Sequence, residues 1–148
     1  MMMMTARCAC TEQNVSGQTR STYKSSNTLR KSKEKIKLKK AKNPVLFAGS
    51  GIRISDTYSE FIKLTKVLSI PVVTGWNAHD LISNSSAFYA GRPGTVGDRP
   101  GNFTVQNSDL IIILGCRLNI RQISYNWRSF AKNAYKVMVD IDVSEFNK

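Results

Sequence analysis

The sequence has little cysteine, little histidine and few acidic residues. Its 148 residues include three cysteines and one histidine, and 22 Lys and Arg stand against 10 Asp and Glu. Cys8 and Cys10 lie near the start and Cys116 lies far from them, which excludes a disulfide framework and a zinc site built from two ligand pairs. With His79 as the single histidine, the sequence predicts neither a metal site nor a Ser-His-Asp or Cys-His catalytic set.

Long apolar runs are also missing. No stretch approaches the roughly 18 consecutive apolar residues of a membrane-spanning helix, and the start of the chain lacks the apolar region of a secretory signal. We therefore expect a soluble chain in a reducing, cytoplasmic compartment. An organelle transit peptide stays open as the alternative, because the first residues are acid-poor and bear Arg and Ser, although their helical periodicity is poor.

The positive charge is concentrated at the start of the chain. Residues 1–43 hold 11 Lys and Arg against 2 Glu, whereas residues 44–148 hold 11 against 8. Residues 1–40 are rich in Ser, Thr, Asn, Gln and Lys and poor in large apolar residues, so they cannot bury enough surface to offset the entropy lost on ordering. We predict a disordered basic leader over 1–40.

The lysine-rich run "RKSKEKIKLKKAK", residues 30–42, raises an alternative function. A small basic protein could bind nucleic acid through such a leader. A solvated helix or linker explains the run better, because no aromatic stacking platform or base-reading motif accompanies the charge. Ile36, Leu38 and Ala41 supply too few apolar contacts to predict a well-anchored helix here.

From residue 43 onward, strand and helix signals alternate. Short apolar runs predict strands at "PVLFA", "PVVT", "LIIIL" and "YKVMV", and helices are expected over 55–70, 102–108 and 125–133. The first of these helices has Ser55 and Asp56 as cap candidates, and its apolar stripe consists of Phe61, Ile62, Leu64, Val67 and Leu68. Repeated βα units imply an α/β fold, a Rossmann-like parallel sheet with helices on both faces.

Two of the strand ends are alike. "LFAGSGIR" and "IILGCRLNIR" each carry an apolar run into a glycine-bearing turn followed by arginine. If the two strands are neighbours at a switch point, glycine backbone and forked guanidinium donors face one crevice suited to a pyrophosphate. The candidate residues are Gly49, Ser50, Gly51, Arg53, Gly115, Arg117 and Arg121.

A plainer interpretation of these residues stays open. The glycines could simply turn tightly, and the arginines could pair with Asp140 or Asp142. For Cys116, beside these arginines, a lowered thiol pKa is one hypothesis and an inert cysteine at a strand end is the favoured one.

The order of four sequence blocks resembles a known family. "NPVLFAGSGIR", "IPVVTGWNAHDLI", "YAGRPGTVGDRPGNFTVQNSDLIIILGCRLNIRQ" and "VMVDIDVSEFNK" are similar to the central domain of thiamine-pyrophosphate-dependent enzymes, most closely acetolactate-synthase-like proteins. The resemblance covers 41–148. It implies a six-stranded Rossmann-like sheet between two catalytic domains, and an incomplete domain here, truncated at its C-terminal end.

The resemblance also implies ligands. This domain holds FAD in acetolactate synthases, largely as a structural cofactor, and another nucleotide or nothing in relatives. Gly49, Ser50 and Gly51 would border the diphosphate, Arg117 and Arg121 would reach the phosphate and ribityl portion, and residues 91–101 would cover the flavin. Asp140 and Asp142 would lie near the adenosine end, where carboxylates accept ribose hydroxyls well. The alternative for these two is a strand-terminal turn with a helix cap at Asp142 or Ser144.

The chain departs from the family in what it lacks. Neither catalytic domain is present, and "GDRPGN" has Arg99 where a magnesium-binding motif of the family needs glycine. Thiamine pyrophosphate and Mg²⁺ are therefore expected only in the full-length enzyme, and this chain is expected to be inactive alone, with no catalytic residue of its own. Expected partners are a nucleotide, the catalytic domains of the same enzyme family or further copies of the chain; nucleic acid and membranes are not expected.

Overall fold

The computed structural model describes residues 12–13, 19–20, 37–142 and 144–145. Seven strands occur in this part of the chain: β1 (Glu12–Gln13), β2 (Thr19–Arg20), β3 (Pro44–Ala48), β4 (Val72–Thr74), β5 (Tyr89–Gly91), β6 (Leu110–Leu114) and β7 (Tyr135–Val139). The helices are α2 (Gly51–Ile54), α3 (Tyr58–Leu68), α4 (Arg99–Gln106) and α5 (Ile120–Ile123), with the 3-10 turns η1 (Trp76–Ala78) and η2 (Trp127–Ser129).

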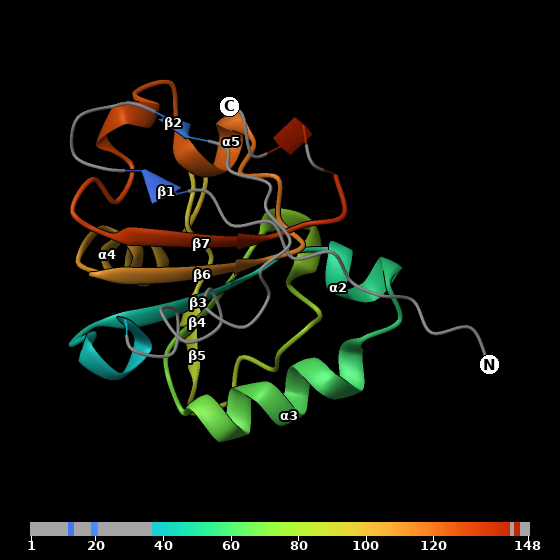
Figure 1. Ribbon diagram of the computed structural model, residues 1–148. Helices are drawn as coiled ribbons and strands as arrows, with labels where there is room; N and C mark the ends of the chain where they lie inside the picture. The colour runs from blue at the N-terminus through green and yellow to red at the C-terminus, as the bar shows by residue number, and fades with distance from the viewer. Residues whose placement is uncertain (1–11, 14–18, 21–36, 143, 146–148) are drawn as a thin grey trace.

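Five of the strands form one parallel sheet in the order β5-β4-β3-β6-β7 (Figure 1). β3 is the first of these strands in the sequence and lies at the centre, with β4 on one side and β6 on the other. The strand order therefore reverses between β3 and β6, which is the topological switch point. The predicted α/β fold is confirmed, and the condition that these two strands are neighbours at a switch point is met. Among the described residues the sheet has five strands, one fewer than the resemblance implied.

Alternate residues of β3 face two separate apolar layers. Val45 and Phe47 pack with Val105 of α4, whereas Leu46 and Ala48 pack with Phe61 of α3. Because successive side chains of a strand point to opposite faces, α3 and α4 cover opposite faces of the sheet. A strand buried on both faces needs a continuous apolar run, which explains why β3 and β6 read as "VLFA" and "LIIIL".

Several predicted boundaries were wrong. The first long helix begins at Tyr58, and its N-cap residue, Thr57, makes no side-chain cap bond, so neither Ser55 nor Asp56 caps it. Val67 is 80% exposed and does not belong to the buried stripe. The helix expected over 102–108 starts earlier, at Arg99, because Asp98 caps it and Pro100 fits its first turn.

Two further differences concern the ends of the sheet. The helix expected over 125–133 is only the 3-10 turn η2, and residues 89–91 form the edge strand β5, where the sequence analysis predicted no strand. Strand β5 has only three residues, and two of them, Ala90 and Gly91, are weak strand formers. Pairing with β4 therefore decided this strand, and that pairing has no local sequence signal.

The segment before β3 is better anchored than its composition predicted. Residues 37–40 are helical, and Leu38 and Ala41 pack against Leu110 and Val137. The carboxylate of Asp109 accepts hydrogen bonds from the backbone N–H groups of Lys42 at 2.6 Å and Asn43 at 3.0 Å. The rest of the predicted disordered leader lies mostly outside the described residues; within it, β1 and β2 form a short antiparallel pair. No helix of the described part combines the length and apolar character needed to cross a bilayer.

Candidate functional site

The turns after β3, β4 and β6 meet at the carboxyl edge of the sheet. The N–H of Gly49 donates to the carbonyl of Leu114 at 2.9 Å, and that of Gly75 donates to Ala48 at 2.8 Å. Gly115 likewise donates to Val139 at 2.8 Å. Each of these glycines therefore extends the sheet ladder by one bond before its turn begins, which fixes the turns relative to one another.

The glycines bring the turns after β3 and β6 into direct backbone contact. A Cβ on Gly51 would lie 2.7 Å from Cα of Gly115, and a Cβ on Gly115 would lie 2.8 Å from Cα of Gly51. A Cβ on Gly49 would meet the carbonyl of Gly115 and the side chain of Cys116. Gly115 also has φ +55°, a conformation that favours glycine. The turn-to-turn approach thus accounts for three glycines that the sequence assigned to a ligand.

The backbone donors at the start of α2 are already used. Gly51 N–H donates to Gly115 at 2.9 Å, Ile52 N–H to Gly49 at 3.3 Å and Arg53 N–H to Ser50 at 3.0 Å. Helix α2 has only four residues. The N–H groups of Gly51, Ile52 and Arg53 are therefore not available to an anion at this turn.

Arg53 is held by an aspartate that the sequence did not suggest. Its Nε donates to Asp80 Oδ2 at 2.7 Å, its NH2 lies 2.6 Å from the same oxygen, and its guanidinium lies 4.8 Å from the centre of the Tyr58 ring. The side chains of Arg53 and Asp80 are 45% and 52% exposed. The arginine therefore lies at the edge in a surface ion pair, turned toward the residues after η1.

Arg117 makes only long contacts with acidic groups. Its NH2 lies 3.9 Å from Asp142 Oδ2 and its Nε lies 3.8 Å from Glu145 Oε1, while its side chain is 65% exposed. The alternative pairing with Asp142 therefore exists in the structure, and Glu145 is a partner that the sequence analysis missed. At these distances most of the donor capacity of the guanidinium stays open to another anion.

The two aspartates after β7 build a turn. Asp140 Oδ1 accepts from the N–H of Asp142 at 3.0 Å, and Asp142 Oδ1 accepts from the N–H of Ser144 at 3.0 Å and its hydroxyl at 2.7 Å. This arrangement matches the alternative of a strand-terminal turn. Asp140 Oδ2 accepts no hydrogen bond within the described part of the chain, so the turn leaves acceptor capacity at the edge beside β6.

Arg121 lies in α5, a short helix that begins with a capping box. Asn119 accepts from the N–H of Arg121 at 3.1 Å, and Gln122 accepts from the N–H of Asn119 at 3.0 Å. The buried Gln122 carboxamide also accepts from the Cys116 thiol at 3.3 Å. Burial raises the pKa of the Cys116 thiol to about 11, so Cys116 is the inert strand-end cysteine rather than an activated one.

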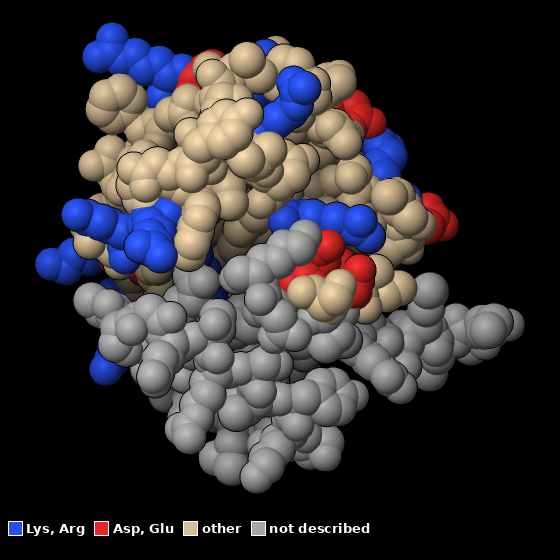
Figure 2. Space-filling view, turned by 90° about the horizontal axis from the view of Figure 1, so that it is seen from above, with Lys and Arg blue, Asp and Glu red and all other residues tan. Residues whose placement is uncertain are grey.

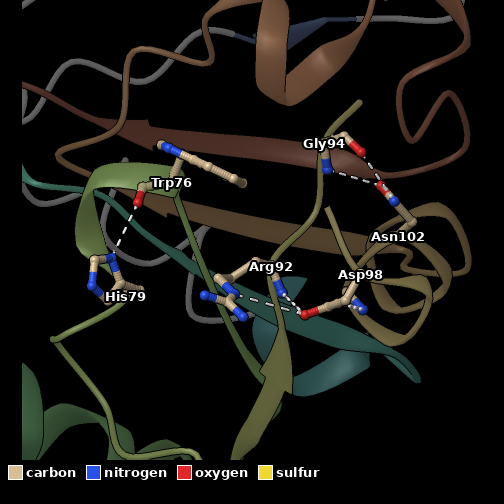
Figure 3. Close-up of polar contacts among 7 residues, drawn as sticks. Trp76, His79, Arg92, Gly94, Asp98 and Asn102 are labelled. Carbon is tan, nitrogen blue, oxygen red and sulfur yellow. Dashed lines mark hydrogen bonds and ion pairs between the residues drawn. The ribbon is translucent and has the colours of Figure 1, made fainter. Parts of the chain in front are cut away.

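The loop between β5 and α4 is held by two side chains (Figure 3). Asp98 accepts from the N–H groups of Gly101 at 2.7 Å and Arg92 at 2.9 Å, so its carboxylate serves as a helix cap rather than a metal ligand. Asn102 accepts from Gly94 N–H at 2.9 Å and donates to Gly94 carbonyl at 3.1 Å. "GDRPGN" is therefore a capping turn.

Arg92 is a candidate site residue that the sequence analysis missed. It follows β5 directly, its side chain is 43% exposed, and its Nε lies 3.9 Å from Asp98 Oδ2. In Figure 3 its guanidinium lies between η1, which carries Trp76, and the Asp98 turn. The signal was present, since Gly91 ends this strand and Arg92 follows it, much as a glycine and an arginine follow β3 and β6, but the strand itself went unrecognised.

Within the described ranges, the other polar groups do not form a second site. His79 is exposed, and its Nδ1 lies 3.3 Å from the carbonyl oxygen of Trp76. No group of three or more His, Cys, Asp or Glu side chains suited to a metal ion occurs among the described residues. Figure 2 shows Lys and Arg scattered over the described surface seen from above, with acidic groups beside some of them, rather than a continuous basic stripe. The structure gives the nucleic-acid alternative no support.

Known proteins are similar in sequence to this chain. The family described as thiamine pyrophosphate enzyme, central domain, matches residues 35–148. The chain is 38% identical to the probable acetolactate synthase large subunit of Methanococcus aeolicus over 120 residues, which are 80% of this chain and 20% of that protein. It is 34% identical to the acetolactate synthase large subunit of Porphyra purpurea over 111 residues, 75% of this chain and 19% of that protein.

A third relative is the acetolactate synthase isozyme 2 large subunit of Escherichia coli (strain K12), with 32% identity over 114 residues, 75% of this chain and 20% of that protein. The chain thus spans about a fifth of the length of these relatives. The family match includes all five strands of the parallel sheet and every arginine discussed at its carboxyl edge. The chain therefore belongs to the family of thiamine pyrophosphate enzyme central domains.

Proposed function

We propose that this chain is the nucleotide-binding and structural central domain of a thiamine-pyrophosphate-dependent enzyme resembling acetolactate synthase. The observation that carries the proposal is the switch point between β3 and β6, beyond which the chain places Arg53, Arg117 and Arg121. In open α/β sheets, ligands bind in the crevice at such a point.

The arginines fit the diphosphate of a nucleotide. Arg117 and Arg121 lie four residues apart on the same connection and both are exposed, so their like charges favour an anion between them. Because the turns after β3 and β6 fill the space between their glycines, the diphosphate would be bound mainly by side chains. Gly49, Ser50, Gly51 and Gly115 would form the floor beneath it, and the carboxylates of Asp140 and Asp142, which follow β7 at the same edge, would accept hydrogen bonds from ribose hydroxyls.

The nucleotide proposed is FAD, with another adenine nucleotide as the alternative. The names of the relatives support this through the acetolactate synthase resemblance, in which FAD is largely structural. The family implies thiamine pyrophosphate and Mg²⁺ in the full enzyme. When bound there, thiamine supplies the carbanion chemistry of decarboxylation and carboligation. The residues described here would bind and orient the nucleotide, and we assign no catalytic role to them.

The carboxyl edge also fits a covering partner. Within six residues after the end of each of the five strands of the parallel sheet lies one large apolar side chain that is more than half exposed. These residues are Ile54, Trp76, Val96, Ile120 and Ile141. Since the relatives are about five times longer, the proposed partners are catalytic domains of the same enzyme family, or further copies of this chain. A reducing compartment such as the cytoplasm suits the buried free thiol of Cys116.

Titration with FAD and with ADP tests the proposed function. Arg117→Ala and Arg121→Ala each remove charge-assisted hydrogen bonds, so each should weaken binding by about tenfold or more. Arg128→Ala is the matched control, because Arg128 is an exposed arginine of the same connection that stacks on Trp127. Equal weakening by all three variants would indicate nonspecific charge attraction. A folded parent that binds neither FAD nor ADP would show the cofactor proposal to be wrong.

A further inference from the structure

The loop after β5 reaches across the sheet edge to the helix after β6. The N–H of Thr95 donates to the carbonyl of Arg121 at 2.8 Å, and the Thr95 hydroxyl donates to the same oxygen at 3.3 Å. Strands β5 and β6 are separated in the sheet by β4 and β3. This contact therefore joins the connections that follow two strands with two others between them, past the switch point. It fixes the backbone from which the Arg121 side chain projects.

The loop tip needs a glycine to approach α5. Gly94 has φ +141°, and a Cβ there would lie 2.6 Å from the carbonyl oxygen of Arg121. A glycine without tertiary contacts is the most mobile residue of a loop, because no side chain restricts its backbone. Something else has to hold the Gly94 peptide in place if Thr95 is to keep its bond to Arg121.

Asn102 supplies that restraint. Its side-chain amide accepts from the Gly94 N–H at 2.9 Å and donates to the Gly94 carbonyl at 3.1 Å (Figure 3). The two hydrogen bonds together hold the backbone of Gly94 on both sides. The backbone of Asn102 belongs to the first turn of α4, where its N–H donates to the carbonyl of Asp98 at 3.2 Å. Helix α4 holds the backbone of Asn102 in a fixed position, because Asp98 caps the start of the helix.

We infer that Asn102 is a positioning residue for the anion site: by holding Gly94, and through it Thr95, it fixes α5 so that Arg121 is placed for a bound diphosphate. The ligand in this inference rests on the proposed function, whereas the coupling from Asn102 to α5 does not. The side chain of Asn102 makes none of the backbone bonds of α4. Its loss should therefore release the loop without unfolding the helix.

Two substitutions at this position separate loop positioning from stability. Asn102→Ala removes both bonds to Gly94. Asn102→Asp keeps an acceptor for the Gly94 N–H but sets a carboxylate oxygen against the Gly94 carbonyl, while its negative charge suits the first turn of a helix and preserves folding. Asn107→Ala is the matched control, since Asn107 lies at the other end of α4 and bonds the Phe103 carbonyl at 2.8 Å.

Hydrogen exchange of the chain without ligand provides the first measurement. The Thr95 amide should exchange about tenfold faster or more in both Asn102 variants, because the loop can then open locally without having to break both hydrogen bonds between Asn102 and Gly94. The Leu46 amide, bonded within the core to Pro71, should be unchanged, and Asn107→Ala should leave Thr95 protected. Unchanged protection of Thr95 in both Asn102 variants would overturn the inference.

The second measurement is a double-mutant cycle on binding of FAD or ADP. Asn102→Asp should weaken binding by about tenfold in the parent, as expected for a misplaced charge-assisted contact, and by much less in the Arg121→Ala background. Equal weakening in both backgrounds would overturn the route through Arg121. If a folded parent binds neither nucleotide, the proposed function is wrong, and the exchange data alone then decide whether Asn102 holds α5.

Discussion

The backbone N–H of Gly51 donates a 2.9 Å hydrogen bond to the carbonyl of Gly115, and this bond joins the turns that follow β3 and β6. The two residues are far apart in the sequence, yet they lie so close in space that a Cβ added to either one would collide with the α-carbon of the other. The glycine turns therefore hold one another in place. The backbone that leads to Arg53 and Arg117 is fixed as a result.

Gly51→Ala should destabilise the fold by about 1–3 kcal/mol, because the new Cβ would lie 2.7 Å from backbone atoms that cannot move independently. Gly75→Ala is the control. Its Cβ would also have a neighbour at 2.7 Å, but that neighbour is Nε2 at the far end of the Gln122 side chain, which can shift more easily than backbone, so the loss should be smaller. Urea unfolding of both variants measures the difference. Equal losses would show that the backbone contact between the turns is not the cause.

Asp80→Asn should raise the affinity for FAD or ADP a few-fold while costing less than about 1 kcal/mol of stability, since exposed ion pairs contribute little. The substitution removes the charge that holds Arg53 at 2.6 Å. Calorimetric titration measures the affinity. Asp56→Asn removes one negative charge from an exposed position nearby, where positive φ suits asparagine. A similar gain in that control would assign the effect to net charge rather than to release of Arg53.

Stability should fall at alkaline pH because of Cys116. Burial raises the pKa of this thiol from its ordinary value of 9.0 to about 11, so the folded chain keeps a proton that the unfolded chain loses between these values. The stabilisation is complete below pH 9 and is lost as pH rises toward 11, by about 2–3 kcal/mol. Urea unfolding at pH 8.5 and 10.5 should show the larger part of this loss in the parent. Cys116→Ala should lack it, and an equal pH dependence in that variant would contradict the prediction.

Asp98→Ala should cost about 1–2 kcal/mol, because it removes the N-cap of α4 and the acceptor for the Arg92 N–H. Asp98→Asn keeps one carbonyl oxygen and should lose less. Thermal unfolding ranks the two variants. Addition of Mg²⁺ should leave the parent and both variants unchanged, since the carboxylate is occupied by backbone donors; stabilisation of the parent alone would show that Asp98 binds the ion.

The strands of this domain were readable from sequence because their signal is local. Runs such as "LIIIL" are apolar on both faces, and that pattern already requires a parallel sheet covered on two sides. Where packing decided the outcome, the prediction was wrong. Val67 fits an apolar stripe by spacing but is exposed, and residues 89–91 became a strand only because β4 offers an unpaired edge. A strand that forms because it pairs with a neighbouring strand cannot be predicted from its own few residues.

For the site, the sequence by itself determined which groups follow β3 and β6: glycines in the turns and then Arg53, Arg117 and Arg121. Only the tertiary structure decided what those groups contact. Arg53 pairs with Asp80, 27 residues away, and Thr95 meets Arg121 across two intervening strands. Such contacts arise between connections of separate βα units, so they depend on the order of strands in the sheet. That order is set by packing of the whole chain, which no local pattern records.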